Sequence, residues 1–481
     1  MIESSLLSLF AALHTQAGGG GTTGAHRRAR GQVFTPPGLA DAVARLALAG
    51  RRPTTVLDPA AGDGALLAAV ARIQPTARLV GIERDVDVAR RGRRQVPGAR
   101  FVVADALAPD AVVPAAALVI ANPPFVRSIR LRADDPHQWA ALRGRFAATS
   151  HGEWDVYGAF LEASLGWLTP RGRAVMIVPS RWLTARWAGP LRAHLAARSA
   201  ARAVIDLGAS QLFAGATTYT SVVVLEPARA AAPMALYQRG PDGWRAAALD
   251  VAALADAPWI APAAPAPRGR RAQVTLGEVA HMAKGAGTNA DGVFVLAGAV
   301  RDGRWVVAGD VVVEAEATRP CLRGRDVGAP PVAWCLVPYL DGRLLPWAEL
   351  VARWPRAAAY LEANRARLEA RERGRFTGER FHGFGRPQNL QFHLDPTPKV
   401  VVPDVVRAPR AWLDATGALV LDSAYALRPR PTAPPPWDRI ETLAELLRSD
   451  ALAAWLARAS VPLRGDYRRI KTGFLAPMPL P

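Results

Sequence analysis

The chain has very little cysteine and no long apolar run. Only Cys321 and Cys335 occur in 481 residues, and neither has Cys or His neighbours at the spacing of a metal site, so we expect neither a disulfide framework nor structural zinc. No apolar run approaches the ~20 residues that span a bilayer, and the short apolar stretch at residues 6–13 follows Glu3 rather than basic residues. The sequence therefore predicts a cytoplasmic protein that is not attached to a membrane.

Lysine is also scarce, although the chain is basic. There are 60 Lys and Arg residues against 41 Asp and Glu residues, a formal net charge of +19, and the only lysines are Lys284, Lys399 and Lys471. A basic excess of this size favours a polyanionic partner such as nucleic acid. A GC-rich genome also produces chains rich in Ala, Arg and Pro, so the charge alone does not identify the partner.

The length of the chain exceeds what one hydrophobic core usually organises, so we expect two domains. Residues 261–270 are rich in Pro and Ala and interrupt the periodic patterns on either side, as an interdomain linker does. We predict a weakly ordered leader over residues 1–30, a first domain over 31–262, a linker over 263–271 and a second domain over 272–481.

The first domain shows short runs of Val, Ile and Leu that alternate with helical stretches, a pattern typical of a mostly parallel sheet with crossover helices. A further run at residues 220–225 follows its predecessor without room for a crossover helix, so it should pair antiparallel. The parallel runs are residues 54–57, 78–82, 100–103, 117–121, 173–178 and 203–207. The prediction is an α/β fold with a doubly wound, mostly parallel, seven-stranded sheet, followed by a C-terminal α+β domain.

A glycine turn with acidic residues follows the first predicted strand and leads into a helical pattern at residues 65–73. Glycine lets the backbone approach a ligand closely. A dinucleotide fold would have G-x-G-x-x-G here, whereas Asp58 and Asp63 would repel a pyrophosphate and suit a ligand with an ammonium group and a sulfonium. The residues of this turn that we assign to the ligand are Asp58, Ala60, Gly62 and Gly64.

Two more carboxylates follow the next two predicted strands. Glu83 follows the second strand, where an acidic residue can accept hydrogen bonds from both ribose hydroxyls. Asp105 follows the third strand, where a carboxylate can accept a hydrogen bond from an adenine amine. Acids at three successive strand ends therefore predict one ligand site along the edge of the sheet.

The tetrapeptide Asn122-Pro123-Pro124-Phe125 follows the fourth strand, at the edge where open sheets bind ligands. An aromatic amine is a poor nucleophile because its lone pair is delocalised into the ring. The Asn122 side-chain oxygen and the Pro123 carbonyl can accept hydrogen bonds from such an amine and draw its nitrogen toward tetrahedral geometry. Phe125 offers a face on which a base can stack.

With these motifs the chain closely resembles the Taq-type, gamma-class adenine-specific DNA methyltransferases and the broader Eco-type methylases of restriction-modification systems. Residues 31–37, Gly-Gln-Val-Phe-Thr-Pro-Pro, resemble the segment that closes over the methionine part of the cofactor, with Thr35 as the matching contact. Residues 157–162 and 178–183 match further motifs of this family, at the corresponding places along the chain. Residues 211–221 match the loop whose aromatic residue stacks on the extruded adenine, which makes Phe213 its counterpart.

The resemblance implies a class I methyltransferase-like fold, S-adenosylmethionine as cofactor, no metal, and direct methyl transfer to N6 of an adenine flipped out of duplex DNA. Two positions depart from the family pattern: Phe125 stands where Tyr is frequent, and Ala106 where a bulky residue is common. The implied catalytic residues are Asn122, Pro123 and Phe125, and the base-stacking residues are Phe125 and Phe213. The implied cofactor-binding residues are Thr35, Asp58, Ala60, Gly62, Gly64, Glu83, Asp105 and Asn122.

The second domain resembles the target-recognition region of the same family, through residues 286–289, 319–326 and 467–473. A long charged helix is predicted over residues 355–373, with acidic residues among its arginines, as on a solvated face. From there to residue 386, arginines are interleaved with Phe376, Phe381 and Phe384. Arginine binds phosphates and the guanine edge, so the predicted DNA contacts are Arg375, Arg380 and Arg386.

Two other functions fit the same motifs. Asn-Pro-Pro-aromatic also serves methyltransferases that act on an RNA base or a protein glutamine, and the chain could instead be a DNA-binding modification subunit that needs a partner. The acids and the tetrapeptide are intact and the second domain is large and basic, so we favour the DNA enzyme. We expect any restriction endonuclease or other defence component to be a separate chain, because no lysine lies in a Glu-x-Lys signature.

Overall fold

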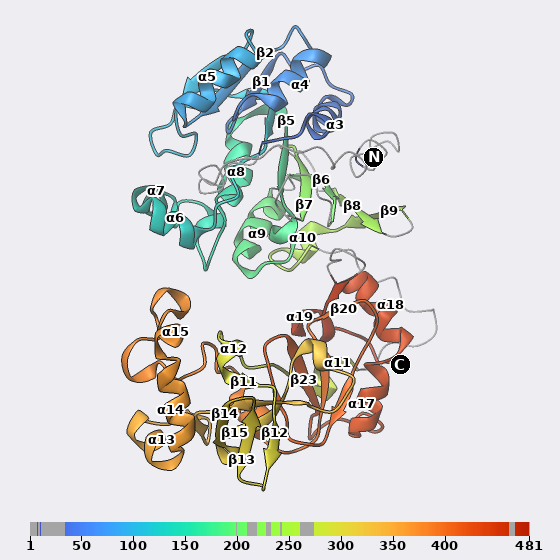
Figure 1. Cartoon of the computed structure of the whole chain (residues 1–481). Helices are drawn as coiled ribbons and strands as arrows, with labels where there is room; N and C mark the ends of the chain where they lie inside the picture. The colour runs from blue at the N-terminus through green and yellow to red at the C-terminus, as the bar shows by residue number, and fades with distance from the viewer. Residues whose placement is uncertain are drawn as a thin grey trace. The chain divides into compact units, whose positions relative to one another are not determined.

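The computed structural model describes residues 7, 10, 34–198, 200–208, 219–227, 232–240, 243–259, 274–460 and 467–480. The chain separates into two compact units, Met1–Pro262 and Ala263–Pro481 (Figure 1). Each unit has hydrophobic clusters of its own. Within the described ranges, no helix combines the length and the apolar composition that a membrane span requires.

A nine-stranded sheet organises the first unit, in the order β3-β2-β1-β4-β5-β7-β6-β8-β9. Strands β1 to β5 run parallel to one another. Strand β7 pairs antiparallel with β5 and β6, as its short connection predicted. The strands are β1 (Thr55–Asp58), β2 (Arg78–Glu83), β3 (Arg100–Val103), β4 (Ala116–Ala121), β5 (Leu168–Pro179), β6 (Ala201–Asp206), β7 (Thr220–Leu225), β8 (Met234–Gly240) and β9 (Gly243–Leu249).

The α/β fold class with a mostly parallel sheet is confirmed, but the prediction of seven strands was wrong. Strand β8 adds to β6 in parallel, and β9 pairs antiparallel with β8 at the edge. Strand β9 has three alanines in a row and is largely exposed. The seven predicted strands, β1 to β7, were identified by their runs of β-branched residues. Strand β9 has no such run, and its alanines are depleted in strands generally.

Successive residues of the central strands face opposite layers of helices. Val175 and Ile177 of β5 join the hydrophobic cluster of α3 (Pro37–Leu48) and α4 (Ala65–Ile73). Met176 and Val178 join the cluster of α8 (Val156–Ser164) and α9 (Gly189–Ala197). This alternation is the period of two of a β-strand. The other helices of this unit are α5 (Val86–Gln95), α6 (Ser128–Asp134), α7 (Pro136–Leu142) and α10 (Val251–Leu254).

The predicted leader is described only at Leu7 and Phe10. Phe10 is 1% exposed and belongs to the cluster of α3 and α4, and Leu7 packs against that cluster. At these two positions the chain is therefore part of the first unit rather than separate from it.

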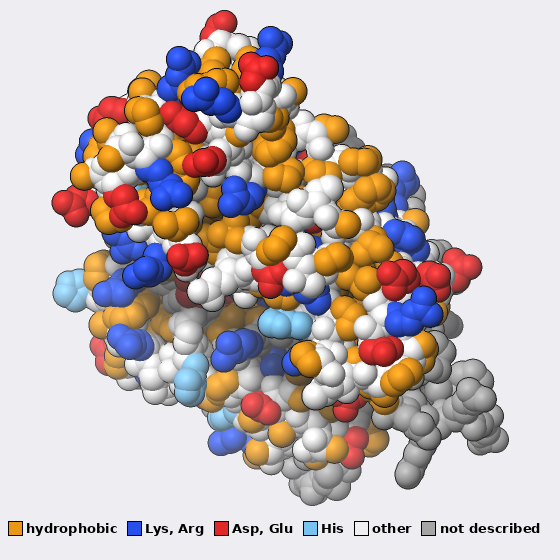
Figure 2. All heavy atoms as spheres, turned by 90° about the horizontal axis from the view of Figure 1, so that it is seen from below, with side chains coloured by type: hydrophobic (Ala, Val, Ile, Leu, Met, Phe, Trp, Pro, Cys, Tyr) orange, Lys and Arg blue, Asp and Glu red, His pale blue; other side chains and the backbone are white. Residues whose placement is uncertain are grey.

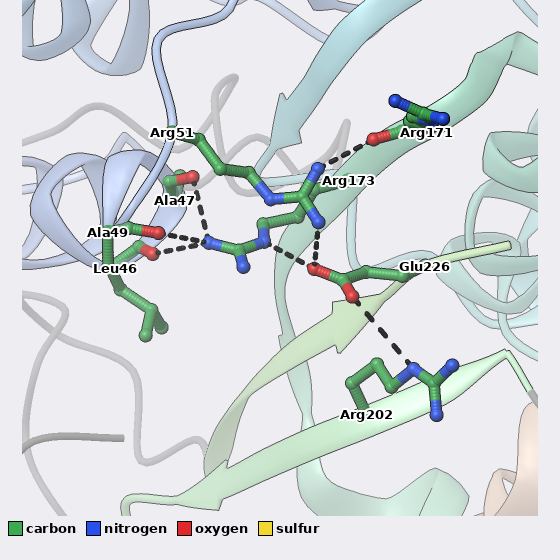
Figure 3. A network of polar contacts seen from close by, with 8 residues as sticks. All are labelled: Leu46, Ala47, Ala49, Arg51, Arg171, Arg173, Arg202 and Glu226. Atoms are coloured by element: carbon green, nitrogen blue, oxygen red, sulfur yellow. Dashed lines mark hydrogen bonds and ion pairs between the residues drawn. The ribbon is translucent and has the colours of Figure 1, made fainter. Parts of the chain in front are cut away.

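A network of charged residues ties the end of α3 to the sheet (Figure 3). Arg173 of β5 donates from Nη1 to the carbonyls of Leu46, Ala47 and Ala49 at 3.4, 3.3 and 3.1 Å, and from Nε to Glu226 Oε1 at 2.7 Å. The last carbonyls of a helix have no partner within the helix, so a guanidinium placed there stabilises it. The position of α3 along the sheet is thus fixed at its C-terminal end.

Glu226 connects three arginines in this network. Besides Arg173, it accepts a hydrogen bond from Arg51 Nη2 at 2.8 Å, and its other oxygen lies 3.9 Å from Arg202 Nε. We expect Glu226→Ala to lower the free energy of unfolding by about 2 kcal/mol, because hydrogen bonds to charged groups are lost and the guanidiniums repel one another. The measurement is urea unfolding, with Asp87→Ala, which removes an exposed ion pair to Arg90, as the control. Equal midpoints for the two variants would contradict this role of Glu226.

The second unit is built from small sheets and short helices, an α+β arrangement. Two four-stranded sheets have the orders β10-β23-β19-β21 and β11-β16-β15-β22, and a three-stranded sheet has the order β12-β13-β14. The strands of these sheets are β10 (Ala280–Lys284), β11 (Val295–Leu296), β12 (Ala299–Arg301), β13 (Trp305–Ala308), β14 (Val311–Glu314), β15 (Thr318–Leu322), β16 (Ala333–Leu336), β19 (Lys399–Pro403), β21 (Trp412–Asp414), β22 (Leu419–Val420) and β23 (Ala424–Pro429). The main helices are α13 (Trp347–Arg353), α14 (Pro355–Ala363), α15 (Arg365–Glu369), α16 (Leu390–Leu394), α17 (Ile440–Leu446) and α18 (Asp450–Ala459).

The prediction of one long helix over residues 355–373 was wrong. The segment consists of α14, α15 and a final turn of 3-10 helix at Arg371–Arg373, within which Glu372 has a left-handed φ of 47°. The helical backbone ends here at two left-handed residues, Glu372 and Gly374, and the Arg371 side chain turns inward to donate hydrogen bonds to backbone carbonyls of other segments. The charge pattern of the sequence does not show this inward turn.

Candidate active site

A cavity of about 550 Å³ opens at the carboxyl end of the parallel strands. Its wall includes predicted ligand residues from four successive strand ends, which a parallel sheet brings to one edge. These wall residues are Ala60 and Gly62 after β1, Glu83 at the end of β2, Asp105 after β3 and Asn122 after β4.

The glycine turn has the backbone conformation that only glycine adopts easily. Gly62 and Gly64 have φ values of 56° and 88°. A Cβ on Gly64 would lie 3.1 Å from Phe101 and Val96, so a side chain there would be both strained and crowded. The Gly62 N–H donates to Glu83 Oε2 at 3.0 Å, which joins the turn to the end of β2.

Three carboxyl groups lie close together around this turn. Asp58 is buried and accepts a hydrogen bond from the Ala60 N–H at 3.0 Å. Burial, with a smaller contribution from the nearby Glu83 and Asp63 carboxylates, raises the pKa of Asp58 to about 8. Burial also raises the pKa of Glu83 and of Asp63. A cationic ligand would relieve this repulsion, so the turn is suited to positive charge.

Asn122 is held in one orientation by the segment before α3. Its Nδ2 donates to Thr35 Oγ1 at 3.1 Å, which sets the direction of the side-chain amide and of its oxygen, Oδ1. Thr35 precedes α3, whose far end Arg173 ties to the sheet. The two residues are 87 positions apart in the sequence.

The rest of the tetrapeptide is fixed by aromatic and backbone contacts. The ring of Phe125 meets Tyr157 edge to face with centroids 6.3 Å apart, and Tyr157 meets Trp187 at 5.7 Å. The segment that follows the tetrapeptide pairs with the one before α8, since the Val156 N–H donates to the Val126 carbonyl at 2.9 Å. The end of the tetrapeptide is therefore held against α8 by a ring contact and a backbone hydrogen bond. Phe213, the other predicted stacking residue, lies outside the described residues.

Helices α6 and α7 form part of the cavity wall that the sequence did not predict. They contribute Leu131, Asp134, Asp135 and Gln138. The signal was present in Asp135-Pro136, because Asp is a preferred helix N-cap and Pro a preferred first residue. Asp135 does cap α7, accepting from the Gln138 N–H at 3.0 Å.

The predicted DNA contacts Arg375, Arg380 and Arg386 are exposed residues of the second unit. Arg375 lies 3.5 Å from one Glu372 carboxylate oxygen, and Arg386 lies 4.0 Å from the other. On the face seen in Figure 2, basic side chains are interspersed with acidic and hydrophobic ones. The positive charge on that face is therefore not gathered into one uniform patch.

Two of the three phenylalanines between these arginines are core residues. Phe381 and Phe384 are buried in the core of the second unit, 1% and 2% exposed, and Arg371 is buried with them. The three phenylalanines follow no regular period, so the sequence does not distinguish an inward ring from an outward one.

Part of the first unit is similar to known restriction-modification methylases. Residues 117–213 match the family model described as Eco57I restriction-modification methylase. The chain is 33% identical over 222 residues to the Type II methyltransferase M.TthHB8I of Thermus thermophilus, covering 45% of this chain and 49% of that one. It is 23% identical over 386 residues to the Type II methyltransferase M.PaeR7I of Pseudomonas aeruginosa, covering 76% of this chain and 64% of that one. The chain thus spans about half of the first relative and under two thirds of the second.

One solved structure resembles almost the whole chain. The Type IIL restriction-modification enzyme MmeI, solved in complex with DNA, matches with a TM-score of 0.59 and 13% identity, over 98% of this chain and 65% of that one. At this identity the likeness concerns the fold. It extends through both compact units.

Proposed function

We propose that this protein, whose residues 117–213 match the restriction-modification methylase family model, transfers a methyl group from S-adenosylmethionine to N6 of an adenine extruded from duplex DNA. The observation that carries the proposal is the position of Asn122. Its amide lies on the wall of the cavity beside the acidic turn, oriented by Thr35, where an amine could be held.

The residues of the cavity fit the cofactor. Glu83 and Asp105 on the cavity wall suit its ribose and adenine, and the carboxyls around the adjoining glycine turn, buried Asp58 and half-buried Asp63, suit its positive charges. When bound, S-adenosylmethionine supplies a methyl group activated by a sulfonium. The chain binds and orients: Asn122 Oδ1 and the Pro123 carbonyl accept hydrogen bonds from the target amine, and Phe125 holds the base. The amine loses its proton to water after it is methylated.

The second unit would supply the contacts that compensate for base extrusion, which costs a few kcal/mol. We assign target recognition to this unit, residues 272–481, with Arg375, Arg380 and Arg386 contacting the duplex. The match to M.PaeR7I, which covers 76% of this chain, supports a role for both units in one activity.

The test is transfer of labelled methyl from S-adenosylmethionine to unmethylated duplex DNA, followed by nucleoside analysis. We expect the label in N6-methyladenine. Absence of label from DNA, in a protein that binds the cofactor, would contradict the proposal and point to an RNA base, a protein glutamine or a missing partner subunit. Label in another nucleoside would contradict the choice of adenine.

Affinity for S-adenosylmethionine should rise with pH. The pKa of Asp58 is about 8 in the free protein, so the carboxyl is mostly protonated at neutral pH, and a cationic ligand favours its ionised form. Binding therefore releases protons below pH 8, and the dissociation constant should fall as pH rises toward 8 and level off above it. Isothermal titration calorimetry across this range measures the effect. S-Adenosylhomocysteine, which lacks the sulfonium charge, should show a smaller dependence; equal dependences would contradict the role of Asp58.

A further inference from the structure

A side-chain amide on α7 contacts the acid that follows β3. Gln138 Nε2 donates to Asp105 Oδ2 at 2.5 Å, while the other oxygen, Oδ1, accepts from the Leu107 N–H at 2.9 Å. Both Gln138 and Asp105 lie on the cavity wall. The amide and the carboxylate therefore present neighbouring polar atoms to whatever occupies that end of the cavity.

Arg84 fixes the direction of this amide. Its Nη1 donates to Gln138 Oε1 at 2.9 Å, and its Nη2 lies 3.4 Å from Asp135 Oδ2 at the start of α7. A guanidinium can only donate and a carboxylate can only accept. Gln138 must therefore direct its oxygen to Arg84 and its NH2 group to Asp105.

Gln138 Nε2 and Asp105 Oδ2 form a donor beside an acceptor, a pattern complementary to the N1–N6 edge of adenine. The Gln138 NH2 group carries two hydrogens, of which the bond to Asp105 uses one, and a carboxylate oxygen can accept more than one hydrogen bond. A donor beside an acceptor matches adenine, which accepts at N1 and donates at N6. A 6-oxopurine has the opposite pattern, with a donor at N1 and an acceptor at position 6.

We propose that Gln138 determines specificity for the adenine of the cofactor, donating its second amide hydrogen to N1 while Asp105 accepts from N6. The inference rests on the proposed function, because it takes S-adenosylmethionine as the ligand of this cavity. It assigns α7 a direct contact with the cofactor, in addition to the strand-end residues. Arg84 acts as a positioning residue, through Gln138.

The experiment compares binding of S-adenosylhomocysteine and S-inosylhomocysteine by isothermal titration calorimetry, which needs neither DNA nor turnover. The full-length protein should prefer the adenosyl ligand by about 100-fold or more, because unpaired polar groups in a site built for hydrogen bonding reject the wrong ligand strongly. Gln138→Ala should lower the affinity for S-adenosylhomocysteine about tenfold and leave the affinity for S-inosylhomocysteine unchanged, since a hydrogen bond is lost only with adenine. Gln95→Ala, an exposed glutamine on α5, is the matched control and should bind like the unmodified protein.

Arg84→Ala provides a second variant that keeps Gln138 and releases its amide. It should also reduce the preference, while circular dichroism and the melting temperature stay those of the unmodified protein. An unchanged preference in folded Gln138→Ala or Arg84→Ala would overturn the inference and assign N1 to another donor, such as the Ala106 N–H. If the unmodified protein binds neither ligand, the proposed cofactor itself is wrong.

Discussion

Replacing Asn122 by alanine should reduce the rate of methyl transfer by about 100- to 1,000-fold, the usual effect of removing one oriented hydrogen-bonding group from an active site. The Oδ1 acceptor that draws the amine nitrogen toward tetrahedral geometry is lost. The acids around the glycine turn remain, so the affinity for S-adenosylmethionine should change little. The substitution should therefore lower the rate of methyl transfer and leave cofactor affinity nearly unchanged.

Single-turnover methylation of DNA and calorimetric binding of the cofactor measure the two quantities separately. A matched control is Asn364→Ala in the second unit, where the amide donates only within its own helical segment, to the Tyr360 carbonyl at 2.9 Å. Its rate should equal that of the unmodified protein. Near-normal turnover of Asn122→Ala would refute the role assigned to the amide.

Replacing Arg371 by alanine should lower the free energy of unfolding of the second unit by about 3 kcal/mol, because several buried carbonyls lose a charged hydrogen-bond donor at once. Arg371 is 7% exposed and burial lowers its pKa, so its hydrogen bonds stabilise a charge that water does not. It donates to the carbonyls of Leu368, Thr288, Gly383 and Phe381 at 2.7, 2.8, 2.9 and 2.5 Å. Without it, these buried acceptors lose their donor.

Urea unfolding followed by tryptophan fluorescence checks this value. The stability of Arg371→Lys should lie between those of the unmodified protein and Arg371→Ala, because an ammonium group has only three donors and cannot match the geometry of a guanidinium. Arg375→Ala is the matched control: its side chain is 76% exposed, so its removal should change stability by no more than about 0.5 kcal/mol. Equal stability of the Arg371 and Arg375 variants would contradict the buried role. The Arg375 variant should instead weaken DNA binding.

The strands that the sequence predicted are those with continuous runs of β-branched and other apolar residues. Burial on both faces of a central parallel strand requires such runs, so β1 to β7 could be located from the sequence. Strands β8 and β9, the last two at one end of the sheet, have no such run and were missed. The predicted ligand residues Gly62, Glu83, Asp105 and Asn122 lie on one cavity, because the carboxyl ends of parallel strands share an edge of the sheet.

The functions of individual arginines and amides depended on contacts between distant segments. Nothing near Arg371 in the sequence distinguishes it from Arg375, yet one is buried against backbone carbonyls and the other is exposed. In the sequence, Gln138 likewise looks like any other helical residue, and only the structure shows that it contacts Asp105. The sequence by itself therefore determined the sheet, the glycine turn and the order of the acids, since these follow from local pattern and strand direction. Only the tertiary structure decided which polar side chains stabilise the fold and which face the cavity, because that depends on neighbours far away along the chain.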